Sequence, residues 1–189
     1  MSNNENIFFD LKRIKYLGKN VKIGKTVRIR YPEKTSIGDN SIIDDFVYIS
    51  CDLDMGKYSH ISANCSIVGG KGHVKIGNYV GISPGSSLIA QSSEYTKVSF
   101  ELPSIPSEIS FGGKGSFINI GDHVLIGAHS IILPNVSLPD GVASTAKTIF
   151  RKKKYEPWFL YHGEKAKKLR KRDNTKLLEY LKENSESIK

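Results

Sequence analysis

The chain has 189 residues, of which 28 are Lys or Arg and 19 are Asp or Glu, so its formal net charge is +9. A hydrophobic content of 39% excludes a disordered chain, and no apolar stretch approaches the ~20 residues of a membrane-spanning helix. Two cysteines, Cys51 and Cys65, are too few for a disulfide scaffold, so we expect a cytoplasmic single domain without a secretory signal.

The first element in chain order is a predicted N-terminal cap, residues 1–20. Ile7, Leu11, Ile14 and Leu17 fall at helical spacing and form a weakly apolar face. We expect this face to cover the open end of the structure that follows.

From about residue 21 the sequence repeats in units of six residues. A unit begins with an aliphatic residue in all but the last case, and its fifth residue is small or β-branched. The units begin at Ile23, Ile37, Ile43, Met55, Ile61, Ile76, Ile82, Ile120, Ile126, Ile132, Leu138 and Ser144. Three such strands complete one triangular coil, with the aliphatic residues at the interior corners, and stacked coils bury one continuous column. The repeat therefore predicts an all-β solenoid over residues 21–150, and no helical period supports a doubly wound α/β sheet.

Two segments interrupt the repeat. Residues 68–75 form a short Gly-rich turn between coils. Residues 90–117 contain Pro103 and Pro106 and cannot continue the coil, so we expect them to project as an arm.

The final segment, residues 151–189, is predicted to close the solenoid and to end in a short helix. Leu177, Leu178 and Leu181 lie on one face of this helix, and Asn174 is a candidate N-cap.

The positive charge is confined to one stretch of the chain. Residues 147–172 contain eleven Lys or Arg and two Glu, which accounts for the whole net charge of +9. Such a segment can bind a polyanion, form a pocket for a small phosphorylated ligand, or remain a solvated basic tail.

The run IGDHVLIGAHSIILPNVSLPDGV and the closing segment EPWFLYHGEKAKKLRKR resemble the hexapeptide-repeat acyltransferases. The similarity covers about residues 21–172 and is closest to the sugar O- and N-acetyltransferases of bacterial surface-polysaccharide synthesis. It implies a left-handed parallel β-helix, a homotrimer, and acetyl-CoA as the acyl donor. It also implies transfer to a hydroxyl of a sugar. Two alternatives stay open: N-acetylation of a nucleotide-linked amino sugar, and a non-catalytic scaffold that binds a polyanion or a partner.

His60 is the expected catalytic residue. It precedes the corner residue Ile61 and therefore faces outward, with Ile42 and Gly81 as its neighbours on the adjacent coils. Gly81 leaves space beside the imidazole, and a histidine is suited to remove a proton from an attacking hydroxyl. In galactoside-type relatives the base lies in the loop after the coil that matches ISPGSSL, but here that loop, IAQSSEYTK, has no histidine. An amine acceptor can attack without a protein base.

Acceptor-binding residues are expected near His60 and on the arm. The candidates are Asp45, Asn64, Glu94 and Tyr95. Asn64 matches a position where sugar acetyltransferases place an acceptor-binding Asn. Asp44 and Asp45 could orient His60, bind sugar hydroxyls, or stay solvated, and adjacent strand residues point to opposite sides, so only one can reach a given pocket.

Similarity to the family implies a donor site on the late coils. The pantetheine arm would meet the backbone of Ala128 and Ala146, and the phosphates would meet Arg151, Lys152, Lys167 and Arg170. One departure is Thr145-Ala146-Lys147, where relatives usually have Gly-Ala-Gly, and these bulkier side chains could narrow the channel.

Neither nucleic acid nor a metal ion is an expected partner. The basic segment occupies the place of the donor phosphates and has few aromatic residues for base stacking. The three-histidine spacing of the β-helix carbonic anhydrases is not reproduced by His73, His123 and His129.

Overall fold

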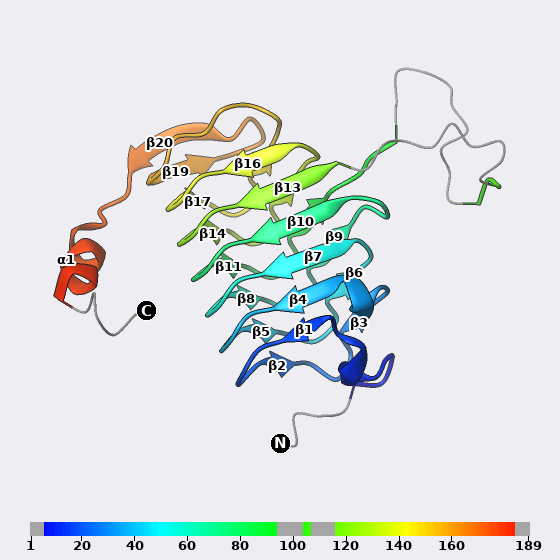
Figure 1. Cartoon of the computed structure of the whole chain (residues 1–189). Coiled ribbons are helices and arrows are strands. Elements are labelled where there is room, and N and C mark those ends of the chain that lie inside the picture. The colour runs from blue at the N-terminus through cyan, green and yellow to red at the C-terminus, as the bar shows by residue number, and fades with distance from the viewer. Residues whose placement is uncertain (1–5, 94–103, 107–115, 184–189) are drawn as a thin grey trace.

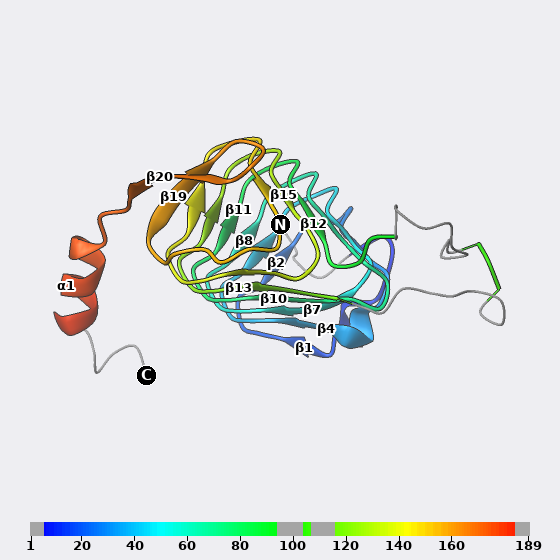
Figure 2. The ribbon, with the colours of Figure 1, turned by 90° about the horizontal axis from the view of Figure 1, so that it is seen from above.

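The computed structural model describes residues 6–93, 104–106 and 116–183. This part of the chain is a parallel β-solenoid, with its N-terminal coil at one end and a closing hairpin at the other (Figure 1). Seen from above, the successive coils lie over one another (Figure 2). The predicted all-β solenoid is confirmed.

Three sheets form the faces of the solenoid. Sheet A contains β1 (Tyr16–Leu17), β4 (Thr35–Ile37), β7 (Asp52–Met55), β10 (His73–Ile76), β13 (Phe117–Ile120) and β16 (Val136–Leu138). Sheet B contains β2 (Lys22–Ile23), β5 (Ile42–Ile43), β8 (His60–Ile61), β11 (Gly81–Ile82), β14 (Leu125–Ile126), β17 (Ala143–Ser144), β19 (Phe159–His162) and β20 (Lys167–Lys171). Sheet C contains β3 (Arg28–Ile29), β6 (Tyr48–Ile49), β9 (Ser66–Val68), β12 (Ser87–Ile89), β15 (Ile131–Ile132) and β18 (Ile149–Phe150). In the described part of the chain the paired strands are parallel except β19–β20, which is an antiparallel hairpin.

The interior is narrow and is filled by the fifth residue of each unit. All twelve of these residues are buried: Val27, Ser41, Val47, Ser59, Cys65, Val80, Ser86, Val124, Ser130, Val136, Val142 and Thr148. The buried hydroxyls bond to neighbouring coils. Ser59 donates from Oγ to the carbonyl of Gly77 (2.8 Å) and accepts from the amide of Val80 (3.0 Å). Small residues therefore fill the interior and satisfy their own polar groups there.

The turns between sheets stack into columns as well. The AB corner, between sheets A and B, carries Tyr58, Tyr79 and His123, whereas the BC corner carries Asn64 and His129; all five have positive φ. Equivalent positions on successive coils are about 4.8 Å apart. A residue's place in its unit thus decides which distant residues become its neighbours.

The N-terminal segment closes the first coil, but its helical spacing does not form an α-helix. It contains one 3-10 turn, Leu11–Arg13, and of the four apolar residues at helical spacing only Ile14 is buried. Asn6 donates from Nδ2 to the carbonyls of Gly24 (3.2 Å) and Val27 (2.7 Å). Backbone carbonyls left open at the end of the stack are satisfied in this way.

Neither interruption breaks the stack. Residues 69–72 turn between β9 and β10, with Gly70 in the left-handed region at φ 48°. Most of the predicted arm, residues 90–117, lies outside the described residues. After it, β13 pairs with β10 over four residues, so the coil resumes in register.

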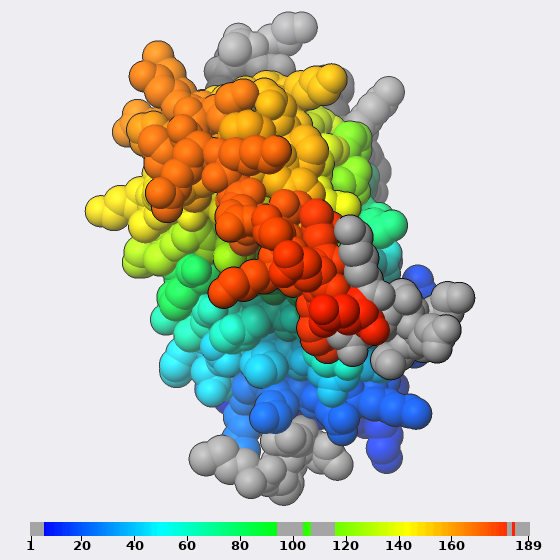
Figure 3. Space-filling view, turned by 90° about the vertical axis from the view of Figure 1, so that its left-hand side faces the viewer, coloured from blue at the N-terminus to red at the C-terminus, as the bar shows by residue number. Residues whose placement is uncertain are grey.

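An aromatic cluster closes the C-terminal end of the core. Phe150, Tyr155 and Tyr161 are buried and meet edge to face, with ring centroids 5.2–6.3 Å apart. Helix α1 (Thr175–Glu183) follows. In the view of Figure 3 it lies in front of the middle coils of the solenoid. The carboxylate of Asp173, rather than the side chain of Asn174, accepts the amide of Thr175 (3.0 Å).

Candidate functional site

One column of residues on the outer face of sheet B joins the middle coils to the closing hairpin. In register order this sheet B column is His60, Gly81, Leu125, Ala143, Leu160 and Arg170. Between the imidazole and the guanidinium lies an apolar strip. The chemistry that the sequence predicted for His60 therefore shares one face with part of the basic segment.

His60 is held by a carboxylate. Its Nε2 lies 2.8 Å from Oδ2 of Asp44, and the two side chains are 45% and 41% exposed. A carboxylate only accepts hydrogen bonds, so Nε2 carries the proton and donates it, which leaves the lone pair of Nδ1 free. The pair can position an imidazole with an unprotonated nitrogen toward an acceptor.

The two adjacent aspartates follow β5, at the turn into the next strand, and their carboxylates have different partners. The carboxylate of Asp45 accepts hydrogen bonds from the hydroxyl (2.6 Å) and the amide (2.9 Å) of Thr26, and so links its own coil to the preceding one. These two hydrogen bonds hold the pKa of Asp45 below its usual value. Asp44, not Asp45, is the aspartate in contact with His60, and acceptor binding by Asp45 stays a prediction.

Space beside His60 is set by two neighbours. Register confirms Ile42 and Gly81 on the adjacent coils. A Cβ at Gly81 would meet only Cδ2 of Leu125, at 3.0 Å. Leu125 is 47% exposed, so the ledge beside the imidazole is open to solvent but partly covered by a leucine side chain.

Asn64 lies on the same coil as His60, across the BC corner. Its backbone is left-handed at φ 60°, its amide donates to the carbonyl of Asp45 (3.3 Å), and its side chain is exposed. Glu94 and Tyr95, the other two predicted acceptor residues, lie outside the described residues.

The six predicted donor residues occupy three parts of the fold. Ala128 and Ala146 stack at the BC corner, where the carbonyl of Ala128 accepts the amide of Lys147 (2.8 Å). Arg151 and Lys152 follow β18 in sheet C and are exposed. Lys167 and Arg170 are on β20, with Lys167 at the end that pairs with His162. The structure therefore brings the two alanines together but not all the predicted cations. Ala146 is an exposed residue despite the larger flanking Thr145 and Lys147.

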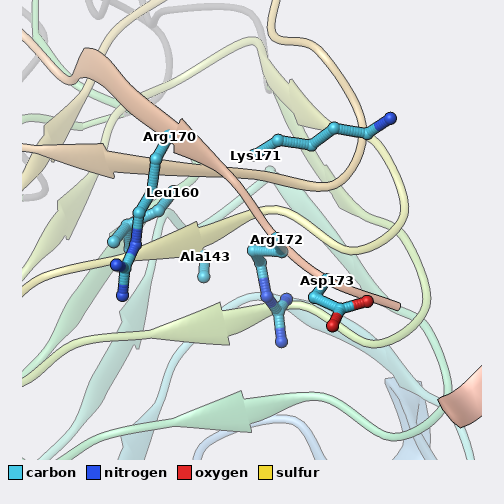
Figure 4. Close-up of a pocket in the computed structure, with 6 residues that line it drawn as sticks. All are labelled: Ala143, Leu160, Arg170, Lys171, Arg172 and Asp173. Atoms are coloured by element: carbon cyan, nitrogen blue, oxygen red, sulfur yellow. The ribbon is translucent and has the colours of Figure 1, made fainter. Parts of the chain in front are cut away.

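A further cation, Arg172, was not expected from the sequence to bind a ligand. It is half-buried and donates from Nη1 to the carbonyls of His123 (3.0 Å) and Gly141 (2.7 Å). Burial lowers the pKa of its guanidinium. Figure 4 shows Arg170 and Arg172 extending in the same direction across the outer face of sheet B.

The aromatic rings of the AB corner form a stack that the sequence reading also missed. The centroids of Tyr58 and Tyr79 are 5.2 Å apart, and those of Tyr79 and His123 are 4.9 Å apart, with nearly parallel planes. Trp158 fills the space above Gly141 and comes within 5.9 Å of His123. The repeat contained this signal, because Tyr58, Tyr79 and His123 each occupy the fourth position of their six-residue unit.

A second histidine–carboxylate pair lies on sheet A. Nε2 of His73 is 2.9 Å from Oδ2 of Asp54. The surrounding hollow is lined by Lys15, Glu33, Lys34, Asp52, Asp54 and His73. Both hydrogen-bonded pairs arise because equivalent positions of adjacent coils come within side-chain reach.

The described residues contain neither a cluster of metal ligands nor a helix able to span a membrane. Groups of three or more His, Cys, Asp or Glu able to hold a metal ion do not occur in this part of the chain. None of its helices has the length and apolar character needed to cross a membrane.

Comparison with known proteins gives closely related matches. No protein-family model matches the sequence. The chain is 36% identical over 168 residues to the dTDP-4-amino-4,6-dideoxy-D-glucose acyltransferase of Escherichia coli, which covers 87% of this chain and 85% of that protein.

Solved structures give the same picture. AntD, an N-acyltransferase from Bacillus cereus in complex with dTDP and 3-hydroxybutyryl-CoA, matches with a TM-score of 0.83 and 32% identity, covering 97% of this chain and 98% of that one. A serine-to-alanine variant of AntD, in complex with dTDP-4-amino-4,6-dideoxyglucose and coenzyme A, matches with a TM-score of 0.83 and 31% identity over 97% and 100% of the two chains. A maltose O-acetyltransferase from Clostridium difficile, at 17% identity and a TM-score of 0.53 over 86% and 72% of the two chains, shares the fold alone.

Proposed function

Because the chain belongs to the hexapeptide-repeat sugar acyltransferases with a left-handed β-helix, we propose that it acylates the amino group of a dTDP-linked 4-amino-4,6-dideoxy sugar, with an acyl-CoA as donor. The observation that carries the proposal is the near-complete coverage of both chains at more than 30% identity with the E. coli acyltransferase and AntD. These relatives favour the amine acceptor over the sugar hydroxyl that the sequence reading placed first. Membership of an acyltransferase family also sets aside the non-catalytic scaffold.

The proposed reaction forms one bond and breaks one. The amine nitrogen attacks the thioester carbonyl carbon, a tetrahedral oxyanion forms, and the C–S bond breaks to release the coenzyme A thiolate. The free Nδ1 of His60, positioned by Asp44, takes the proton that the nitrogen loses and passes it to the thiolate. His60 is thus the proposed general base and Asp44 its positioning residue.

We place the donor on the late coils, as the family resemblance implies. Ala128 and Ala146 offer backbone groups at the BC corner, and Arg151, Lys152 and Lys167 provide exposed cations near the closing end. Asn64, on the same coil as His60 and at the adjoining BC corner, is the proposed acceptor contact among the described residues. Positively charged side chains suit the phosphates of the donor.

We further propose a cytoplasmic homotrimer. Half-exposed His60 and Asp44 leave the reacting groups open on one side, and a neighbouring subunit would cover them. Light scattering of the purified protein tests the trimer; a monomer at working concentration would contradict it.

Burial raises the pKa of both free thiols, to about 12 for Cys51, so both stay protonated and unreactive in the folded chain.

The function is tested with matched acceptors. Purified protein is incubated with acetyl-CoA or 3-hydroxybutyryl-CoA and with dTDP-4-amino-4,6-dideoxyglucose, and thiol release and acylated product are measured. The control acceptor is the same nucleotide sugar with a hydroxyl at C4. We expect turnover with the amine and at least about 100-fold less with the hydroxyl, because a hydroxyl is a much weaker nucleophile than an amine toward a thioester. Turnover with the hydroxyl alone would restore O-transfer, and turnover with neither would contradict the proposal.

A further inference from the structure

Two hollows meet on the outer face of sheet B beside the closing hairpin. The larger, about 480 Å³, is lined by Ala143, Leu160, Arg170, Lys171, Arg172 and Asp173. The smaller, about 250 Å³, is lined by Tyr79, His123, Leu125, Trp158, Arg172, Asp173, Asn174 and Leu177. Arg172 and Asp173 border both, so the two hollows adjoin.

The larger hollow carries uncompensated positive charge. Within the described part of the chain, neither Arg170 nor Arg172 forms an ion pair with a carboxylate. Both guanidinium groups point across the floor of Ala143 and Leu160 (Figure 4). Asp173 points away from Arg170, and its carboxylate accepts the amide of Thr175. Two guanidinium groups over one concave surface suit a diphosphate, whose oxygens accept paired charge-assisted hydrogen bonds.

The smaller hollow is walled by aromatic rings. His123 and Trp158 stand 5.9 Å apart with a 32° tilt, at the end of the stack that begins with Tyr58 and Tyr79. Arg172 fixes this wall, because Nη1 donates to the carbonyls of His123 and Gly141. Aromatic surface next to arginine favours a planar base.

We infer that the two hollows together form a binding site for a nucleoside diphosphate, with the diphosphate on Arg170 and Arg172 and the base against Trp158 and His123. Resting on the proposed function, this site takes the nucleotide of the acceptor. The same chemistry occurs in coenzyme A, which carries an adenine and a diphosphate. The position of the hollow argues for the acceptor.

Position is given by the sheet B column. From His60 to Ala143, the floor of the larger hollow, there are three strand spacings, or about 14 Å. An extended nucleotide sugar can bridge this span, with its sugar beside the imidazole and its diphosphate under the arginines. The alanines proposed for the donor lie at the BC corner, whereas the aromatic wall lies at the AB corner.

Trp158 provides a direct readout, since it is the only tryptophan of the chain. dTDP and coenzyme A are titrated separately against the full chain, and the change in Trp158 fluorescence gives each dissociation constant. The test variant is Arg170→Gln, and the matched control is Lys154→Gln, which removes the same charge from an exposed side chain of the basic segment that lines neither hollow. Both positions are exposed, so both variants are expected to fold; thermal melts check this.

We expect Arg170→Gln to weaken dTDP binding about tenfold and coenzyme A binding less than twofold, with Lys154→Gln changing either less than twofold. A loss confined to coenzyme A, or an equal loss for both ligands, would assign the hollow to the donor and overturn the inference. An unchanged affinity for dTDP would overturn it too. So would equal losses in the two variants, which would indicate a general charge effect.

The inference and the proposed function fail separately. Turnover of the dTDP-amino sugar by Arg170→Gln with an unchanged KM for the acceptor would refute the site and leave the function standing. Binding of dTDP that depends on Arg170, in an enzyme that acylates no dTDP-amino sugar, would refute the function and leave the nucleotide site standing.

Discussion

The described part of the molecule contains two histidine–aspartate pairs, with nearly equal distances, on two different faces. On sheet B, His60 lies 2.8 Å from Asp44; on sheet A, His73 lies 2.9 Å from Asp54. Both histidines donate through Nε2 to a carboxylate on the preceding coil. The hydrogen bond alone therefore cannot distinguish a reactive pair from a structural one.

Their surroundings differ. Beside His73 are Phe117 in register and an ion pair between Lys34 and Asp52 (3.4 Å). Beside His60 are Ile42 and Gly81, and the column continues over apolar residues to the guanidinium of Arg170. A site for acyl transfer needs space at the free nitrogen and a way to hold the substrate. Of the two faces, only that of sheet B combines an open ledge beside the imidazole with a cationic hollow in the same column.

The largest difference between the two faces is expected when each imidazole is removed in turn. His60→Gln is expected to lower kcat for acyl transfer ~100-fold or more, because it removes the proposed base. The matched change His73→Gln is expected to alter kcat less than twofold. Steady-state thiol release measures both. Equal effects, or full activity in His60→Gln, would show that the amine needs no base from this histidine.

The carboxylates give the next largest effect. Asp44→Asn is expected to lower kcat about 10–100-fold, because an amide does not hold the imidazole in one tautomer as a carboxylate does. The pH dependence of kcat should shift in this variant, which a purely structural loss would not cause. Asp54→Asn is the control on sheet A. A pH profile identical to that of the wild type would contradict a positioning role for Asp44.

Filling the ledge beside His60 tests whether access distinguishes the two faces. Gly81→Val places a β-branched side chain next to the imidazole, and we expect kcat/KM to fall about tenfold because the acceptor is displaced. Thermal stability should change little, since valine favours strands and the added Cβ meets only the end of the flexible side chain of Leu125. Melting temperature and kcat/KM are measured together. A parallel loss of both would mean that the substitution damaged the coil.

The smallest effect is expected at Asp45, which contacts Thr26 rather than His60. Asp45→Ala should lower the free energy of unfolding at pH 7 by about 0.5 kcal/mol, a small value because the group is exposed to solvent. The native pKa of Asp45 is depressed, so this contribution is present above the ordinary value of 3.8 and is lost as the pH falls through the native pKa. Chemical denaturation at pH 7 and at pH 3 measures it. A raised KM for the acceptor would instead support the predicted acceptor contact.

The repeat predicts the outward direction of His60 and its neighbours, but not which aspartate contacts it. The hexad pattern predicts that His60 faces outward between Ile42 and Gly81, because each unit fixes the orientation of its six residues. It also predicts that only one of Asp44 and Asp45 reaches a given site. It does not predict which one, because the corner turn decides the direction of each carboxylate.

The apolar spacing of the N-terminal residues was a weaker guide. Helical spacing there produces a single 3-10 turn, after which Tyr16–Leu17 joins sheet A as β1. Hydrogen bonds to the open edge of the first coil compete with a helix, and the edge of the stack prevails.

By itself, the sequence determined the interior of this protein: small fifth residues and aliphatic corners can be buried together only in a triangular coil. Tertiary structure decided which outward side chains share a column. Gly81 meets Leu125, 44 positions later, because β11 and β14 pair in register although the six-residue repeat is interrupted between them. The closing hairpin then reverses the chain and brings Arg170 and Arg172 back over sheet B. A six-residue period does not encode the sequence offsets that an interruption of the repeat and a reversal of the chain introduce. The basic segment could therefore be located in the sequence, but its cationic hollow could not.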